Sequence, residues 1–352
     1  MTAHSPLKGP SVWLGNEIEN DPRWRYHLSG SHIAEIDAAL AGVRQAGLAW
    51  YDLTIHSFPL PNLKDLLADI GQELEQGVGF ALLRGLPIER YDEAQRRALW
   101  YGMGCHLGQP VHQDCHGLLM RDITDAQQDT DSVFGHHLQT RDGQAFASSK
   151  ARTLSNGPLR FHTDRTDVVA LLCAATSSSG GASRIASSPA VHNQILAERP
   201  DLLEVLFAPY QRSRLGEEIG GENMTYPLPV FGIQDGYFTS HYSRTYIEAA
   251  EEMDGVAKLT IEQVEAIEML HDAADALCFG MQLEAGDMQF LNSHVTYHAR
   301  DAFEDNPGQN APGRCLHRLW LTTPNNRPLP EDHKILWRSV KAGTPRGGIT
   351  LK

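Results

Sequence analysis

The stretch Leu159-Arg160-Phe161-His162-Thr163-Asp164 stands just before an apolar run, Val168-Val169-Ala170-Leu171-Leu172-Cys173. Residues i and i+2 of an extended strand point to the same side. His162 and Asp164 therefore place an imidazole and a carboxylate on one face. In a chain with 17 histidines, such a pair on its own is more often solvated surface than a metal site. The interpretation therefore depends on residues further along the chain.

A second element, residues 292–305, carries two more histidines. His294 and His298 are four residues apart and share strand parity, so parity does not choose between them. Two histidines and one carboxylate on one face of an octahedral ion are the ligand set of the non-haem Fe(II) oxygenases. His162, Asp164 and one of these two histidines would complete that set.

A third element, Gly313-Arg314-Cys315-Leu316-His317-Arg318-Leu319-Trp320-Leu321, has two arginines four residues apart on an apolar strand. They would share a face of the strand. Arginine binds carboxylates through two parallel hydrogen bonds. Because an inward-facing arginine is costly unless an anion meets it, this strand predicts an anion site.

Composition limits the classes of partner. The chain has 352 residues, is 41% hydrophobic and has a formal net charge of −14. An acidic chain is a poor match for nucleic acid, which needs a concentrated basic surface. No apolar run is long enough to span a membrane, and residues 1–8 lack the apolar core of a signal peptide. Five scattered cysteines without a CxxC pair are typical of reduced thiols. We expect a cytoplasmic protein with a small-molecule substrate and no nucleic-acid or membrane partner.

The pattern of elements predicts an α+β fold. Apolar residues recur at helical spacing in four segments, and short apolar runs predict strands. The expected helices are 31–45, 62–76, 92–105 and 261–276, and the expected strands include 77–87, 184–187, 288–298 and 315–321. Residues 109–156 are polar and aperiodic, which is typical of an active-site loop or lid. Helices gathered early and strands later favour a β-sandwich or barrel with helices packed outside it.

At this point the sequence resembles the Fe(II)/2-oxoglutarate-dependent dioxygenases of the taurine dioxygenase and 2,4-dichlorophenoxyacetate dioxygenase family. The resemblance covers roughly residues 75–325. Its motifs are Gly79-Phe80-Ala81-Leu82-Leu83-Arg84-Gly85, Phe161-His162-Thr163-Asp164, Gly180-Gly181-Ala182-Ser183, His298-Ala299-Arg300-Asp301-Ala302-Phe303-Glu304-Asp305 and Arg314-Cys315-Leu316-His317-Arg318-Leu319-Trp320-Leu321. The family fold is a double-stranded β-helix (jelly roll) with flanking helices, of the clavaminate synthase-like type. The resemblance implies one dioxygenase domain over 1–352, with 1–75 as an N-terminal helical arm and 109–156 as the loop or lid.

The same resemblance implies roles for individual residues. His162, Asp164 and His298 would ligate Fe(II), with His298 preferred over His294 because it precedes the Ala-Arg-x-Ala-Phe segment. Arg314, aided by Ser183, would hold the distal carboxylate of 2-oxoglutarate. Arg318 would reach the substrate or the cosubstrate. With O₂, such enzymes release succinate and CO₂ and usually hydroxylate a C–H bond, with desaturation as a variant. Halogenating relatives lack the carboxylate ligand, so Asp164 favours an oxygenase. Family members commonly self-associate, so a homo-oligomer is compatible with the resemblance.

Substrate contacts are expected from three places. Gln113 lies in a loop where relatives place substrate-facing residues, and Tyr242 with Arg244 forms a second candidate set. Arg165, directly after the HxD motif, departs from the small residue expected there and is a candidate for meeting an anionic substrate. The arginines favour a carboxylate-bearing small molecule such as an amino acid or a natural-product intermediate. For each of these residues, a hydrogen-bonded loop residue or strand-end charge is the competing interpretation.

Two alternatives remain open from the sequence. A metal-dependent hydrolase or isomerase on a cupin-like barrel could use the same three ligands with Zn or Mn, but it would not need the Arg314 and Arg318 pair. A non-catalytic ligand-binding jelly roll is the second alternative. It predicts that 2-oxoglutarate is never converted to succinate.

Overall fold

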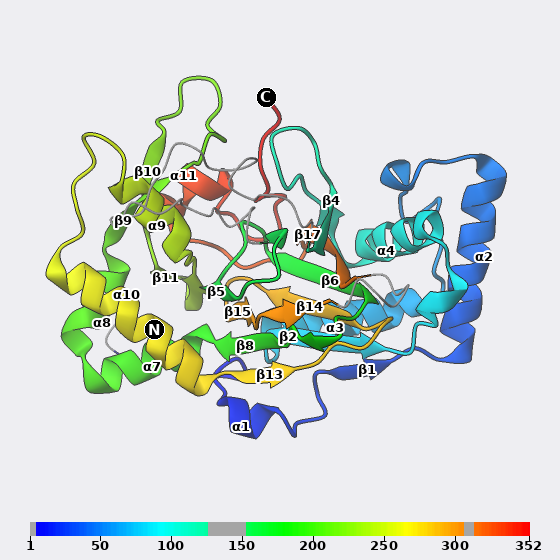
Figure 1. Ribbon diagram of the computed structural model, residues 1–352, viewed down its shortest axis with the longest axis horizontal. Coiled ribbons are helices and arrows are strands. Elements are labelled where there is room, and N and C mark those ends of the chain that lie inside the picture. Colours follow the sequence, from blue (N-terminus) through cyan, green and yellow to red (C-terminus); the bar gives the residue numbers. More distant parts are fainter. Residues whose placement is uncertain (1–4, 126–152, 306–312) are drawn as a thin grey trace.

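The computed structural model describes residues 5–125, 153–305 and 313–352 (Figure 1). Two groups of helices lie at opposite ends of the molecule, α2 and α4 at one end and α7, α8 and α10 at the other. The helices are α1 (Gly15–Ile18), α2 (Gly30–Ala46), α3 (Leu63–Gln76), α4 (Glu93–Leu107), α7 (Ser188–Glu198), α8 (Pro200–Phe207), α9 (Arg244–Glu251), α10 (Ile261–Leu277) and α11 (Lys334–Trp337), with short 3-10 turns at Trp50–Asp52, Ile88–Arg90 and Glu331–His333.

A large sheet of seven strands forms the middle of the molecule, in the order β1-β2-β14-β6-β17-β3, with β4 also pairing with β17. Only the β1–β2 pair is parallel among the strand pairs described for this sheet. Its strands are β1 (Arg25–His27), β2 (Phe80–Arg84), β3 (Gln109–Pro110), β4 (Met120–Thr124), β6 (Val168–Ala175), β14 (Met288–Asn292) and β17 (Cys315–Thr322).

A smaller antiparallel sheet has the order β13-β8-β15-β5, and three two-stranded ribbons complete the described strands. The small sheet contains β5 (Leu159–His162), β8 (Ser183–Ser187), β13 (Phe279–Met281) and β15 (Thr296–Arg300). The ribbons are β7 (Ser179–Gly180) with β16 (Phe303–Glu304), β9 (Pro209–Ser213) with β10 (Thr225–Pro229), and β11 (Phe231–Gln234) with β12 (Tyr237–Ser240).

Alternate residues of β6 pack on opposite faces of the large sheet, and this shows which layer lies on each side of it. In β6, Val169 and Leu171 join an apolar cluster that also contains Ile185 of β8 and Phe279 of β13. The intervening residues of β6, among them Leu172, pack instead in the cluster formed with α2, α3 and α4. One face of the large sheet therefore meets the small sheet, and the other meets the N-terminal helices.

The small sheet is covered on its outer face by the second group of helices. Phe161 of β5 and Tyr297 of β15 share a cluster with residues of α7, α8 and α10. His162 and His298, the next residue of each strand, therefore face the space between the two sheets. Within the described ranges, no helix has the length and apolarity that a membrane span requires.

The four expected helices are confirmed within a few residues, and for three of them the structure shows why they begin where they do. Ser29, Asp92 and Thr260 each form a capping box at the start of α2, α4 and α10. The prediction of one strand over 288–298 is wrong. The chain forms β14 and then β15, which belong to different sheets, with a turn between them. The expected loop 109–156 contains β3 and β4, and its part 126–152 lies outside the described residues.

Candidate active site

Three side chains converge between the sheets. One ligand atom each from His162, Asp164 and His298 lies within 4.8 Å of the other two. His162 and His298 are direct cross-strand partners on β5 and β15, with ring centroids 4.1 Å apart. Strand β5 ends at His162, so Asp164 lies just beyond the strand, yet its Oδ1 is 3.7 Å from His162 Nε2. The grouping predicted from the sequence is therefore formed.

Each of the two histidines keeps a ring nitrogen that can act as a metal ligand. His162 Nδ1 donates a hydrogen bond of 2.8 Å to the carbonyl of Arg160, which leaves Nε2 as the acceptor nitrogen. His298 Nδ1 is buried and has no hydrogen-bond partner within the described part of the chain. Two imidazole nitrogens and one carboxylate oxygen, with one nitrogen buried and unsatisfied, suit a divalent transition-metal ion.

The surroundings keep all three groups in the protonation state that a metal ligand needs. Burial lowers the pKa of His298 to about 3 and also lowers the pKa of His162, although Asp164 opposes the latter shift. Burial alone would raise the pKa of Asp164, but Arg318 and the two histidines outweigh it and lower the pKa to about 2. At neutral pH the site therefore has two neutral imidazoles and one carboxylate.

A pocket on one side of the histidines, which we call the Arg314 pocket, is lined by His162, Ser183, His298, Arg314 and Arg318 among others. Arg314 Nη1 is buried without a hydrogen-bond partner in the described structure, and the guanidinium lies 5.1 Å from the centre of the Phe303 ring. Ser183 Oγ donates to Gln289 Oε1 at 2.9 Å. A buried cation with an unused donor beside the ligand cluster is suited to a carboxylate.

A second pocket, which we call the Arg165 pocket, also adjoins the cluster. Its lining includes Gln113, His162, Asp164, Arg165 and Arg318, together with Arg214, Tyr226, Tyr246, Leu336 and Ile349. His162 and Arg318 line both pockets. A molecule in either pocket would therefore lie next to the ligand cluster.

The family model described as "Taurine catabolism dioxygenase TauD, TfdA family" matches residues 46–320, which is more than half of the chain. The chain belongs to this family. It is a 2-oxoglutarate-dependent non-haem iron dioxygenase, an enzyme class that uses Fe(II), 2-oxoglutarate and O₂. Family membership thus selects this class over the hydrolase, isomerase and non-catalytic alternatives.

Individual relatives agree with the family assignment. The chain is 31% identical to FR-33289 synthase of Streptomyces rubellomurinus, over 92% of this chain and 93% of the relative. It is 26% identical to the taurine hydroxylase-like protein SAT17 of Stachybotrys chartarum, over 94% and 81% of the two chains. Two solved structures share the fold: an asparagine oxygenase in complex with Fe(II), 3-hydroxyasparagine and succinate (TM-score 0.59, 19% identity, 85% and 94% covered) and the non-heme iron oxygenase OrfP with Fe and alpha-ketoglutaric acid (TM-score 0.58, 14% identity, 85% and 93% covered).

Gln113 and Arg318, which we expected to contact the substrate, lie beside the ligand cluster but form hydrogen bonds to other groups of the protein. Arg318 Nη1 donates to Asp164 Oδ2 at 3.0 Å, and its Nε donates to Gln113 Oε1 at 2.8 Å. Gln113 Nε2 donates in turn to the carbonyls of Leu119 and Arg318. Gln113 thus holds Arg318, and Arg318 holds the carboxylate.

Tyr242 and Arg244 line neither of these two pockets, although Arg244 and His162 line a third, smaller one. Tyr242 is buried in the apolar cluster of α7, α8 and α10, with its ring 5.7 Å from that of Tyr297. Arg244 begins α9 and pairs with Glu248 at 2.7 Å. Neither residue lines the Arg314 or the Arg165 pocket as described. The expectation that Tyr242 and Arg244 contact the substrate stays a prediction, whereas Gln113, Arg165 and Arg318 are brought together in the Arg165 pocket.

His294 belongs to a different network. It is fully buried, its Nε2 donates to Asp167 Oδ1 at 2.9 Å, and its Nδ1 lies 2.8 Å from the Thr239 hydroxyl. It sits in the turn between β14 and β15 rather than on the strand of His298. The shared parity that left His294 as an alternative ligand rested on a single strand, which the structure does not contain.

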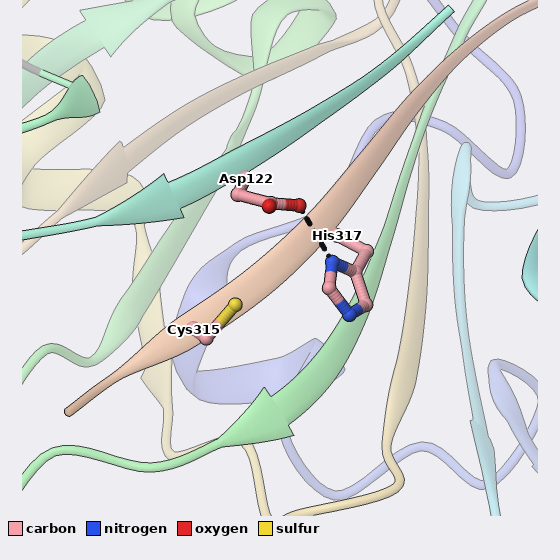
Figure 2. A group of neighbouring side chains, drawn as sticks. All are labelled: Asp122, Cys315 and His317. Atoms are coloured by element: carbon pink, nitrogen blue, oxygen red, sulfur yellow. Dashed lines mark hydrogen bonds and ion pairs between the residues drawn. The ribbon is translucent and has the colours of Figure 1, made fainter. Parts of the chain in front are cut away.

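A second group of metal-ligand types lies on the opposite face of β17. Figure 2 shows Asp122, Cys315 and His317, with His317 Nδ1 bonded to Asp122 Oδ1 at 2.7 Å. Arg97 of α4 is hydrogen-bonded to the other oxygen of Asp122. Both oxygens of the carboxylate are therefore already hydrogen-bonded, and the group joins α4 to the sheet.

Three residues that line the Arg165 pocket, Trp320, Arg214 and Leu336, were not predicted from the sequence. Trp320 donates from Nε1 to Asp164 Oδ2 at 2.8 Å. It stands two residues after Arg318, so strand parity alone places it on the same face and could have identified it. Arg214 of the loop after β9 and Leu336 of α11 carry no such signal, because only the tertiary fold brings them to the pocket.

Proposed function

We propose that His162, Asp164 and His298 bind Fe(II) and that Arg314, with Ser183, holds the distal carboxylate of 2-oxoglutarate in the Arg314 pocket. The observation that carries this proposal is the pairing of two features in one place. Three ligand atoms lie within 4.8 Å of one another, and a buried, unpartnered guanidinium nitrogen lines the adjoining pocket.

The reaction we propose is hydroxylation or desaturation of an unactivated C–H bond in a small carboxylate-bearing molecule, such as an amino acid or a natural-product intermediate. The substrate would occupy the Arg165 pocket. Bound iron supplies the oxidative chemistry with O₂ and 2-oxoglutarate, and succinate and CO₂ are released. An oxygenase of asparagine and OrfP bound to L-Arg, both with this fold, support an amino acid as the substrate class.

The chain's own residues supply geometry and shielding. The Arg160 carbonyl orients His162 through its Nδ1–H. Arg318 and Trp320 hold Asp164 Oδ2, so that Oδ1 is the oxygen left for the metal. Arg314 contributes a charge-assisted hydrogen bond to the cosubstrate. Burial of Asp164, Arg314, Arg318 and Trp320 keeps bulk water away from the reacting atoms.

We extend the proposal to the architecture. The two facing sheets would form the double-stranded β-helix of the clavaminate synthase-like fold, within one domain over 1–352. Residues 1–75 would be the helical arm, and α2 and α3 pack on the large sheet in agreement with this. Residues 109–156 would form the active-site loop or lid. Five cysteines without a disulfide among the described residues support a cytoplasmic location.

Anaerobic spectroscopy tests the proposed site. Addition of Fe(II) and then 2-oxoglutarate to the purified enzyme without O₂ should produce the visible charge-transfer band of the chelated cosubstrate. His298→Ala should abolish the band. Arg314→Met should raise the 2-oxoglutarate concentration needed for half-saturation by about tenfold or more, because one charge-assisted bond is lost. Arg184→Met, a change at a partly exposed arginine paired with Asp275, is the matched control.

Two results would contradict the proposal. The first is that iron binds to the His298→Ala protein as tightly as to the wild type. The second is that the wild-type protein is folded and loaded with iron but shows no charge-transfer band with 2-oxoglutarate. With the active wild-type enzyme, a panel of metabolites identifies the substrate as the compound that stimulates succinate release.

A further inference from the structure

The Arg165 pocket contains two arginines: Arg165 forms no ion pair within the described residues, and Arg214 has a long ion pair of 3.7 Å with Glu222. Arg165 Nη2 donates to the Leu336 carbonyl at 3.0 Å, and its Nε is buried without a hydrogen-bond partner in the described structure. Arg214 donates to the carbonyls of Asn223 and Ile335, at 3.1 and 3.3 Å. Carbonyl oxygens satisfy N–H groups but do not neutralise a guanidinium.

The acids near these arginines are few. Glu222 lies 3.7 Å from Arg214 Nε, beyond hydrogen-bond distance, and Glu217 lines the pocket. Asp164 also lines it, but Arg318 already pairs with that carboxylate. Within the described residues, Arg165 forms no ion pair at all. A buried guanidinium without a paired acid is costly unless an anion binds next to it.

Hydroxyl donors stand on the same wall. Tyr226 and Tyr246 both line the pocket. The Arg214 guanidinium lies 4.7 Å from the centre of the Tyr226 ring, which keeps the two side chains together. Two guanidinium groups and two hydroxyls form a donor set around one part of the pocket.

We propose that Arg165 and Arg214, with the hydroxyls of Tyr226 and Tyr246, form an oxyanion subsite that binds the charged head group of the substrate. The subsite takes a carboxylate, sulfonate or phosphonate group. It is separate from Arg318, which is committed to Asp164 and Gln113. The inference rests on the proposed function in one respect, that the Arg165 pocket is where the substrate lies.

The proposal specifies how the substrate is oriented. The head group sits at the wall to which the loop after β9 contributes Arg214 and α11 contributes Leu336, and His162 and Asp164 of the ligand cluster line the same pocket. The carbon that reacts must therefore lie on the part of the substrate that faces His162 and Asp164, away from the charged group. Selectivity between head groups would follow from charge, since two arginines favour a dianion over a monoanion.

Calorimetric titration of the anaerobic Fe(II)·2-oxoglutarate enzyme with small anions tests the subsite. The probes are acetate, methanesulfonate and methylphosphonate, and the one with the lowest Kd identifies the head group. In Arg165→Gln and in Arg214→Gln, the Kd of that probe should rise roughly ten- to hundredfold, as expected for the loss of one charge-assisted hydrogen bond. Tyr246→Phe, which removes only a hydroxyl, should raise it less.

Arg338→Gln is the matched control, because it removes a neighbouring positive charge from a residue that does not line the described pocket. It should leave the Kd unchanged. The charge-transfer band of each variant shows whether the iron and 2-oxoglutarate sites are intact. Should Arg165→Gln fail to fold, Arg214→Gln and Tyr246→Phe still test the subsite. The inference is overturned if the folded variants bind the probe as tightly as the wild type. Failure of the proposed function is a different result, namely absence of the band in the wild-type enzyme.

Discussion

The indole Nε1 of Trp320 donates a hydrogen bond of 2.8 Å to Oδ2 of Asp164. Arg318 Nη1 donates to the same oxygen at 3.0 Å. Both bonds are buried, and together they leave Oδ1 on the side of His162. The carboxylate is thus oriented before any metal binds, which reduces the rotational freedom that iron binding would otherwise have to remove.

Trp320→Phe should weaken iron binding while the protein stays folded. The ring is kept, but the carboxylate loses one of the two donors that orient it. Loss of such an outer partner typically lowers metal affinity about 10- to 100-fold. Fe(II) titration under argon, followed by the charge-transfer band, measures the effect. Trp100→Phe is the matched control, since its indole also donates one buried hydrogen bond, to the His317 carbonyl, on the other face of the sheet. Equal iron affinities in the two variants would contradict the assigned role of Trp320.

Gln113→Leu tests whether Gln113 acts through Arg318. The variant leaves Arg318 Nε without its partner in a buried site, which should lower the free energy of unfolding by about 1–3 kcal/mol. It should also lower iron affinity, because Arg318 is freed from one of its two anchors. Urea unfolding and Fe(II) titration measure the two effects. Gln194→Leu, which removes an exposed bond to Glu198, should change neither. If Gln113→Leu lowered only the substrate affinity and left stability and iron affinity unchanged, this would support the expectation that Gln113 contacts the substrate.

Local patterns were sufficient for much of the fold and for the ligand cluster. Helices such as α2 and α10 have capping residues and helical periodicity within their own sequence, so they were predictable. The division of 288–298 into β14 and β15 was not. Both halves are apolar and extended, and the turn between them is stabilised by contacts with residues distant in sequence, such as the bond from the Ser293 N–H to the Asp167 carbonyl. A period-2 pattern does not reveal such a change of sheet.

The same limit applies to the pockets. Arg318 lies on β17 and Arg314 immediately precedes the strand, where the pairing with β6 is irregular, yet both line the Arg314 pocket as the four-residue spacing had suggested. Tyr242 was expected at the substrate because of its neighbours in sequence, but its ring turns into the apolar core beside Tyr297. Arg214 was overlooked because it reaches the Arg165 pocket from a loop about fifty residues further along the chain. Side chains brought together only by tertiary contacts leave no periodic signal.

Gly180→Ala should destabilise the fold near the Arg314 pocket. Gly180 has φ +70°, and a Cβ added there would lie 2.2 Å from the Ala302 carbonyl oxygen in the β7–β16 ribbon. Both the left-handed backbone and the clash oppose a side chain, so we expect a loss of about 1–3 kcal/mol in the free energy of unfolding. Thermal and urea unfolding measure it. Gly42→Ala within α2, where an added Cβ meets nothing within 4 Å, should instead stabilise by about 0.5–1 kcal/mol. Equal effects of the two substitutions would argue against the described backbone of Gly180.

His294 should make the stability of the enzyme depend on pH. Burial, opposed by the hydrogen bond to Asp167 and reinforced by Arg346, lowers the pKa of His294 to about 4 from an ordinary value of 6.5. As pH falls below 6.5, the unfolded chain takes up a proton here and the native protein does not. The free energy of unfolding of the wild type therefore decreases between pH 6.5 and 4, by roughly 3 kcal/mol for this group, and no further below its folded pKa.

Comparison of two variants isolates this contribution from that of the other buried histidines. His294→Asn should be less stable than the wild type at pH 7.5, but the difference should narrow by roughly 3 kcal/mol as pH falls to 4, because the variant has no imidazole to titrate. Thr239→Val removes the hydroxyl bonded to His294 Nδ1 but keeps the imidazole, so its curve should run nearly parallel to that of the wild type. Urea unfolding of the metal-free proteins between pH 4 and 7.5 measures all three curves. If the His294→Asn curve ran parallel to the wild type as well, His294 would not be held neutral in the folded protein, and the Asp167–Arg346 network would have to stabilise an imidazolium instead.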